Sequence, residues 1–143
     1  ARDEHYAWAD VLAFTSLRDT SGTGLLEALA AGVPILGLDH QGAKDIMTVD
    51  CAVRVPVQTP RQVVTDMASG LVQLAEDPQL LQRLSAGAVV RAHEFHWDRL
   101  SAEMLACYQR ILPETGAVLI RQRATEQTPN AEPALAISPR VTT

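Results

Sequence analysis

The chain has 143 residues, of which 47% are hydrophobic and 20% charged, and its formal net charge is −5. This length and composition are typical of one soluble globular domain that buries a real core. The negative charge argues against nucleic acid as a partner, because contacts with phosphates need a surplus of Lys and Arg. No apolar run reaches the ~20 residues that a membrane-spanning helix needs, and no signal peptide is visible.

Strands and helices alternate in the first part of the chain. Residues 11–15 form a continuous apolar run, which is typical of a strand buried on both faces. A Ser/Thr/Gly loop follows, and strong helix formers then predict a helix over residues 23–31, with Gly32 where a helix stop is expected. Two more strands, over 33–38 and 52–55, flank a short helix over 43–47. This alternation predicts an α/β fold with a doubly wound parallel sheet.

Three helices are predicted after the third strand. Thr59 and Gln62 form the pattern of a capping box, which marks the start of the first helix. Asp77, followed by a proline, starts the second helix in a similar way. The third helix runs from about Trp97 to Leu112, with apolar residues at helical spacing.

The end of the chain has a different character. Residues 115–143 are punctuated by prolines and lack sustained periodicity, so we expect a disordered tail. The expected organisation is therefore a partial Rossmann-like domain over 1–114 and a tail over 115–143. The chain starts at Ala1 in the middle of a pattern, and three strands make a small open sheet. Both observations predict a fragment of something larger.

The loop after the first strand is the most informative segment. It leads through Gly22 and Gly24 into the next helix, so bare N–H groups lie at the positive end of the helix dipole. This arrangement suits a phosphate, and ligands of parallel sheets bind beyond the carboxyl ends of the strands. The alternative is that the two glycines serve only the chain reversal.

Two carboxylates flank this loop. Asp19 comes just before the glycines, and Glu27 lies within an otherwise apolar helix. A carboxylate in apolar surroundings needs hydrogen-bond partners, which the hydroxyls of a ligand would supply. The alternatives are a solvated helix face for Glu27 and turn capping for Asp19.

The segment from Ser16 to Ile35 resembles the signature of retaining nucleotide-sugar glycosyltransferases with two Rossmann-like domains. This is the GT-B type, in the family 4-like group 1. That signature has two acidic residues with seven residues between them, as do Asp19 and Glu27. Weaker matches later in the chain extend the resemblance over about residues 6–112.

The resemblance implies a role for each site residue. Glu27 would bind the ribose hydroxyls of the nucleotide, the backbone from Gly22 to Leu25 would hold the diphosphate, and Asp19 would lie near the donor sugar. The implied catalytic residue is Asp19, and the implied substrate-binding residues are Ser21, Gly22, Thr23, Gly24, Leu25 and Glu27.

The resemblance also implies the wider setting of the chain. It would be the C-terminal, donor-binding part of an enzyme that moves a hexose from a nucleoside-diphosphate sugar to a saccharide, lipid or small-molecule acceptor. An N-terminal domain would be missing, so we expect this chain alone to be inactive. No paired-aspartate metal motif is visible, and no cofactor is expected. The two cysteines form no metal or redox pair, which favours the cytoplasm, and association with a membrane surface stays open.

The sequence departs from the family pattern at several positions. Asp19 replaces the usual Glu, Thr20 and Ser21 replace a Gly-Phe pair, and Gln41 replaces a glycine. One alternative is therefore a nucleotide-sugar-binding module without catalysis, or an inactive paralogue. Another is a flavodoxin-like signalling domain, which predicts a phosphoacceptor Asp at the end of the first strand, where the sequence offers none.

Overall fold

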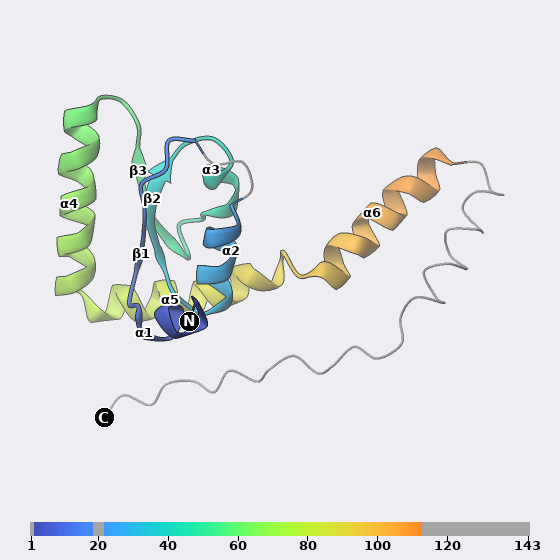
Figure 1. The fold of residues 1–143 in the computed structure, drawn as a ribbon, viewed down its shortest axis with the longest axis horizontal. Coiled ribbons are helices and arrows are strands. Elements are labelled where there is room, and N and C mark those ends of the chain that lie inside the picture. The colour runs from blue at the N-terminus through green and yellow to red at the C-terminus, as the bar shows by residue number, and fades with distance from the viewer. Residues whose placement is uncertain (1, 19–21, 113–143) are drawn as a thin grey trace. The chain divides into compact units, whose positions relative to one another are not determined.

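The computed structural model describes residues 2–18 and 22–112. The chain divides into two compact units, residues 1–99 and 100–143. The first unit contains the sheet and the helices that cover it (Figure 1). The helix α6 (Trp97–Ile111) begins at the end of the first unit and makes up most of the described part of the second. The predicted tail, residues 115–143, lies outside the described residues.

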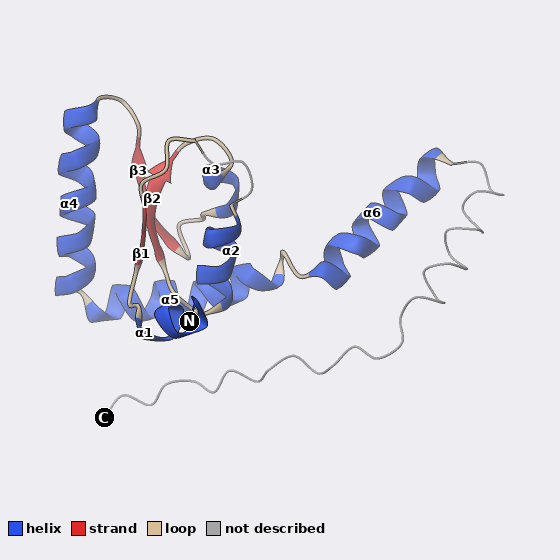
Figure 2. Cartoon of the chain, viewed as in Figure 1, coloured by secondary structure: helices blue, strands red, loops and turns tan. Residues whose placement is uncertain are grey.

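The sheet in the described residues is parallel, as the alternation of strands and helices predicts. The strand order is β1-β2-β3, and the strands stand side by side in Figure 2. In the register, Leu12 lies opposite Ile35, which in turn lies opposite Ala52. The bounds of the strands are Leu12–Phe14 for β1, Ile35–Asp39 for β2 and Ala52–Pro56 for β3.

Helices cover both faces of this sheet. Successive residues of a strand point to opposite sides, so the apolar side chains of β2 need a covering helix on each face. Ile35 of β2 packs in one core cluster with α2 (Thr23–Ala30) and α3 (Ala43–Ile46). Leu36 packs in a second cluster with α4 (Pro60–Glu76). The helix α5 (Pro78–His93) contributes Leu84 to the second cluster and Ala88 to the first. The predicted doubly wound architecture is thus confirmed.

The first strand differs from its prediction. Leu12 and Phe14 are half-buried and Ala13 is exposed, so β1 is not buried on both faces. The physical reason is its place at the edge of the described sheet, where it pairs with β2 alone. The helix α4 packs over β2 and β3, and Ala13, which points to the face opposite Leu12 and Phe14, stays exposed.

Most helix ends follow from local signals in the sequence. The hydroxyl of Thr59 accepts a hydrogen bond of 3.2 Å from the backbone N–H of Gln62, whose side chain accepts one of 3.4 Å from Thr59 N–H. The carboxylate of Asp77 accepts from Leu80 N–H at 2.9 Å. At the end of α2, Gly32 has φ +70°, the left-handed conformation that commonly ends a helix. The predicted capping box and glycine stop are confirmed.

A short helix before the sheet, α1 (Arg2–Trp8), has no counterpart in the prediction. It has 7 residues, too few for helical periodicity to stand out. Tyr6 on this helix is half-buried and packs against the core cluster that α2 and α3 share. The helix therefore exists through contacts with residues distant in the sequence.

A single arginine connects α5 to α3. The guanidinium of Arg91 donates hydrogen bonds to the carbonyls of Ile46 and Asp45, at 2.9 and 2.6 Å, and forms an ion pair with Glu94. It also lies 4.7 Å from the ring centre of Phe95, a cation–π geometry. These contacts hold the end of α3 in place.

Within the described residues, no helix has both the length and the apolar character needed to cross a bilayer.

Candidate functional site

The candidate site is built on the start of α2, which follows the loop after β1. Gly22 is the residue that caps this helix, with φ 62° and ψ 14°. Its carbonyl accepts hydrogen bonds from Leu25 N–H at 3.0 Å and Leu26 N–H at 3.1 Å. A side chain at this left-handed position would cost roughly 1–2 kcal/mol, so the turn itself favours glycine. A glycine at residue 22 is therefore consistent with both interpretations, a simple chain reversal and an anion-binding turn.

Gly24 differs from Gly22 in this respect, since it lies within the helix and its φ is not positive. A Cβ built on Gly24 would lie 3.9 Å from the hydroxyl oxygen of Tyr6, which is an ordinary contact. The fold does not require glycine here. What glycine provides is a first turn whose backbone a ligand can approach closely. The first N–H groups of a helix have no acceptor within it, so the turn can bind an anion.

The side chains of the same turn point to different surroundings. Leu25 is fully buried in the core cluster, so only its backbone can contact a ligand. Thr23 is exposed, and its hydroxyl is accessible beside the start of the helix. Two other predicted site residues, Asp19 and Ser21, lie outside the described residues, as does Thr20.

Glu27 is half-buried, one turn into α2. Its Oε2 accepts a hydrogen bond of 3.2 Å from the hydroxyl of Tyr6, and the same hydroxyl lies 3.3 Å from the carbonyl of Gly24. The structure therefore brings Glu27 and Gly24 together with a residue of α1 at one side of the first turn. The simplest alternative, a fully solvated helix face for Glu27, does not describe this side chain.

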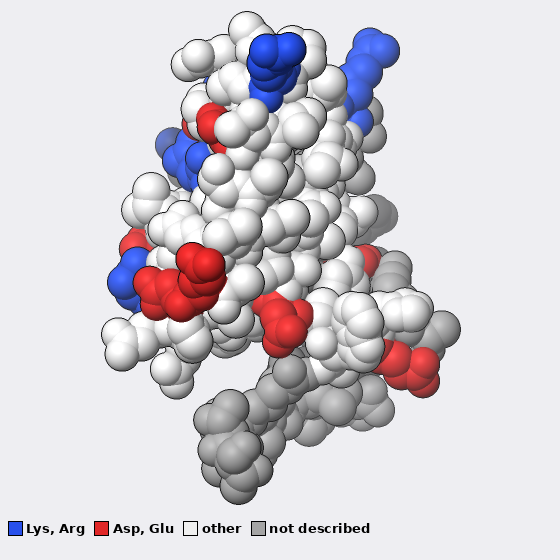
Figure 3. All heavy atoms as spheres, turned by 90° about the vertical axis from the view of Figure 1, so that its left-hand side faces the viewer, with Lys and Arg blue, Asp and Glu red and all other residues white. Residues whose placement is uncertain are grey.

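The carboxyl ends of the strands carry further polar groups. Arg54 of β3 forms an ion pair of 2.6 Å with Asp39 at the end of β2. Arg18, in the loop after β1, and Lys44, on α3, are both exposed. On the side of the molecule where α4 lies, basic side chains gather toward the upper end, where the strands finish (Figure 3). The exposed basic groups among the described residues at this edge favour an anionic ligand.

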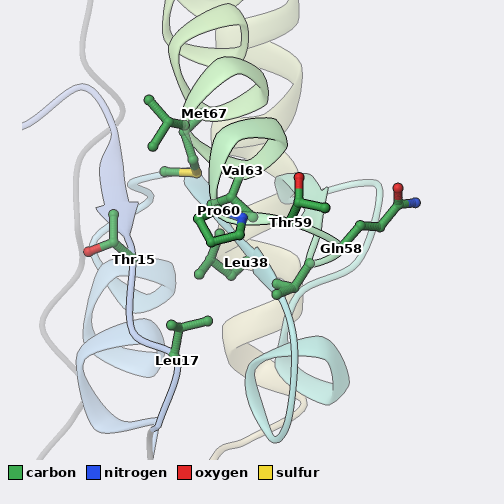
Figure 4. Close-up of a pocket in the computed structure, with 10 residues that line it drawn as sticks. Thr15, Leu17, Leu38, Gln58, Thr59, Pro60, Val63 and Met67 are labelled. Atoms are coloured by element: carbon green, nitrogen blue, oxygen red, sulfur yellow. The ribbon is translucent and has the colours of Figure 1, made fainter.

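An apolar pocket of about 470 Å³ lies at the same edge of the sheet but on the face covered by α4. Figure 4 shows Thr15 and Leu17, from the loop after β1, facing Pro60 and Met67 of α4, with Leu38 between them. Of the predicted site residues that the structure describes, Gly22 to Leu25 and Glu27, none lines it. The predicted diphosphate site and this pocket are therefore different places.

Sequence reasoning missed Tyr6 and the pocket. Tyr6 contacts residues 18 and 21 positions later in the chain, a separation that no local pattern reveals. Val63 and Met67 have the spacing of a core-facing helix stripe, and the structure leaves both half-buried at the rim of the second cluster. Helical spacing identifies an apolar face without showing whether a pocket opens along it.

Comparison with known proteins finds relatives of this chain among glycosyltransferases. The family model described as "Glycosyl transferases group 1" matches residues 2–77, just over half of the chain. A D-inositol 3-phosphate glycosyltransferase of Streptomyces bingchenggensis is 32% identical over 104 residues, which is 72% of this chain and 22% of that protein. A phosphatidyl-myo-inositol mannosyltransferase of Mycolicibacterium smegmatis is 30% identical over 93 residues, 65% of this chain and 23% of that protein.

The fold also has a relative among solved structures. A sucrose-phosphate synthase from Thermosynechococcus elongatus superposes with a TM-score of 0.63 at 21% sequence identity, covering 75% of this chain and 26% of that one. The chain thus spans about a quarter or less of the length of each of these relatives. The expected GT-B, Rossmann-like fold is confirmed, and the chain belongs to the group 1 glycosyltransferases.

Proposed function

We propose that this chain is the donor-binding part of a retaining glycosyltransferase that transfers a hexose from a nucleoside-diphosphate sugar. The observation that carries the proposal is the start of α2, where Gly22 caps the helix, half-buried Gly24 lies in the first turn and Glu27 stands one turn further on. This turn follows β1 at the carboxyl edge of a parallel sheet, the edge where such folds bind nucleotides.

Each part of this turn has a physical task in the proposal. The backbone from Gly22 to Leu25 binds the diphosphate, because helix-start N–H groups stabilise negative charge. The same groups stabilise the charge that develops on the departing nucleoside diphosphate during transfer. Thr23, which is exposed, adds a hydroxyl donor to the phosphates, and we assign Ser21 the same role.

The two carboxylates bind the remaining two parts of the donor, the ribose and the sugar. Glu27 accepts hydrogen bonds from the ribose hydroxyls, and charge-assisted bonds of this kind are stronger than neutral ones. Asp19 binds the hydroxyls of the sugar and orients it. This assignment predicts that replacing Asp19 weakens binding of the nucleotide sugar more than binding of the nucleoside diphosphate.

The acceptor site lies, in this proposal, in the part of the protein outside this chain, since the chain spans 22% of the first relative's length. The acceptor is a saccharide, a lipid or a small molecule. Two relatives are named for acceptors that contain inositol, which favours a small polyol phosphate or its lipid form. The site must exclude water around the donor, and two domains that close on each other can do this.

The test uses the complete protein that contains this chain. It is titrated with UDP, GDP and ADP and then assayed with the corresponding hexose donors, including the Asp19→Asn variant. We expect tight binding of one nucleoside diphosphate, together with release of that diphosphate from its hexose donor when an acceptor is present. Binding without any release would favour the alternative, a nucleotide-sugar-binding module without catalysis. Absence of binding to all three diphosphates would contradict both functions.

A further inference from the structure

Tyr6 contacts the first turn of α2 at two points. Its hydroxyl lies 3.2 Å from Oε2 of Glu27 and 3.3 Å from the carbonyl oxygen of Gly24. Residues three positions apart in a helix lie about one turn apart on the same face. One phenol group therefore spans the turn that the proposed function assigns to the nucleotide, and its single proton is shared between two acceptors.

We propose that Tyr6 is a positioning residue that orients the carboxylate of Glu27 toward the ribose hydroxyls of a nucleoside diphosphate. The inference rests on the proposed function, because it takes Glu27 to be the ribose ligand. Tyr6 does not itself contact the nucleotide in this scheme. It acts through Glu27, and it comes from α1, a helix separated from α2 by the whole of β1 and its loop.

The chemistry of the two side chains supports this role. Glutamate has several rotatable torsions, and a half-exposed carboxylate has room to sample many of them. A tyrosine has only two torsions, so its hydroxyl is held at low entropic cost. The ring of Tyr6 packs against the core cluster that contains Leu25, which fixes the hydroxyl relative to α2.

The acceptor capacity of the carboxylate is compatible with a ligand. An ionised carboxylate offers about four lone-pair sites on two oxygens. The hydrogen bond from Tyr6 occupies only one of these sites, so it does not by itself prevent ribose hydroxyls from binding to the same carboxylate. The bond from Tyr6 also selects the rotamer in which the carboxylate stays beside the glycine turn rather than extending into solvent.

The decisive variant is Tyr6→Phe, which keeps the ring and its packing and removes only the hydroxyl. It is measured in the complete protein, by calorimetric titration with the best-binding diphosphate of UDP, GDP and ADP and with the 2′,3′-dideoxy form of that diphosphate. The same titrations are made with Glu27→Gln and with the double variant. Tyr108→Phe, which removes the hydroxyl of the other tyrosine of the chain, is the matched control.

The expected result is a loss of affinity for the ribose diphosphate of about three- to ten-fold in Tyr6→Phe, because Glu27 is still present but is no longer held toward the ribose. Affinity for the dideoxy form stays unchanged, and so does affinity in Tyr108→Phe. In the Glu27→Gln background, Tyr6→Phe causes no comparable further loss. This pattern separates positioning from a structural role, because a weakened fold would lower the affinity for both diphosphates equally.

Three results would overturn the inference, and they differ in what they imply for the proposed function. In the first two results, Glu27→Gln lowers the affinity for the ribose diphosphate, but Tyr6→Phe either leaves that affinity unchanged or lowers the affinity for both diphosphates equally. Tyr6 then has no positioning role, and the ribose role of Glu27 stands. If Glu27→Gln leaves the affinity for the ribose diphosphate unchanged, the ribose role fails and the role of Tyr6 fails with it.

Discussion

Gly87 of α5 lies directly against the backbone carbonyl of Asp50, in the turn before β3. A Cβ built on Gly87 would stand 1.9 Å from that carbonyl oxygen, far inside any real contact. The obstructing atom belongs to the backbone, so no side-chain rotation can relieve the clash. The absence of a side chain at residue 87 is therefore what allows α5 to lie this close to the turn before β3.

The first prediction compares three Gly→Ala variants in the complete protein. Gly87→Ala should lower the free energy of unfolding by at least about 2 kcal/mol, because the backbone must move. A Cβ on Gly70 would clash with the terminal Cδ1 of Leu36, at 2.6 Å, while its next neighbours, Leu36 Cδ2 and Val53 Cγ1, lie at 3.4 and 3.5 Å. A small shift of the Leu36 side chain, together with the better helix propensity of alanine, should keep the effect of Gly70→Ala within about 1 kcal/mol.

Gly42 completes the series, since a Cβ there meets nothing within 4 Å. Urea denaturation should rank the loss of stability as Gly87 first, Gly70 second and Gly42 last. An equal loss in all three variants would mean that α5 does not approach Asp50 as described.

A second prediction concerns Gln41, which occupies the position where the family pattern has a glycine. It has φ +46°, the one described residue other than glycine with a positive φ. Gln41→Gly removes the left-handed strain, of roughly 1–2 kcal/mol, and adds about 0.5–1 kcal/mol of backbone entropy to the unfolded chain. We expect a net gain in stability below about 1.5 kcal/mol.

Gly32→Ala makes the opposite change, because it adds a side chain at a residue with a positive φ. Gly32 also has a positive φ, and a Cβ there would lie 3.3 Å from Cγ2 of Val89. Its replacement should destabilise the protein by about 1 kcal/mol or more. Thermal unfolding of both variants measures this contrast. A shift of the unfolding temperature in the same direction for both would show that left-handed backbone strain does not determine their stability.

The third prediction tests the open backbone of the first turn of α2. Gly24→Ala should leave the stability nearly unchanged, because the added Cβ would make only an ordinary contact with Tyr6. It should weaken binding of a nucleoside diphosphate by about ten-fold, through one lost close approach worth about 1.4 kcal/mol. Gly42→Ala, equally open, is the control and should bind as the parent does. Unchanged binding in Gly24→Ala would place the diphosphate elsewhere.

The sequence predicted the parts of this fold that depend on short-range signals. The capping box of Thr59 and Gln62, the cap at Asp77 and the glycine stop at Gly32 each need only neighbouring residues. The parallel sheet followed from the alternation of apolar runs with helical patterns. The register and the two core clusters then result from burying both faces of β2.

The parts that the sequence could not predict depend on contacts between distant residues. The helix α1 is held by the packing of Tyr6 against α2, and the end of α3 by hydrogen bonds from Arg91. The expectation of a fully buried β1 was wrong, because an apolar run shows what a strand can bury but not which neighbours cover it. Glu27 was identified through its apolar surroundings and the family signature, and its contact with Tyr6 came only from the structure.

The central claim is that Glu27 binds the ribose of a nucleotide, and Glu27→Gln tests it most directly. The variant keeps the shape of the side chain and loses its charge. Calorimetric titration of the complete protein with its preferred nucleoside diphosphate should show affinity falling about ten-fold or more, since a hydrogen bond to a charged group contributes roughly 1.5–3 kcal/mol. The control Glu76→Gln, at the exposed end of α4, should bind as the parent does. Equal affinity in Glu27→Gln and the parent would contradict the claim and leave Glu27 as a residue that only packs α1 against α2.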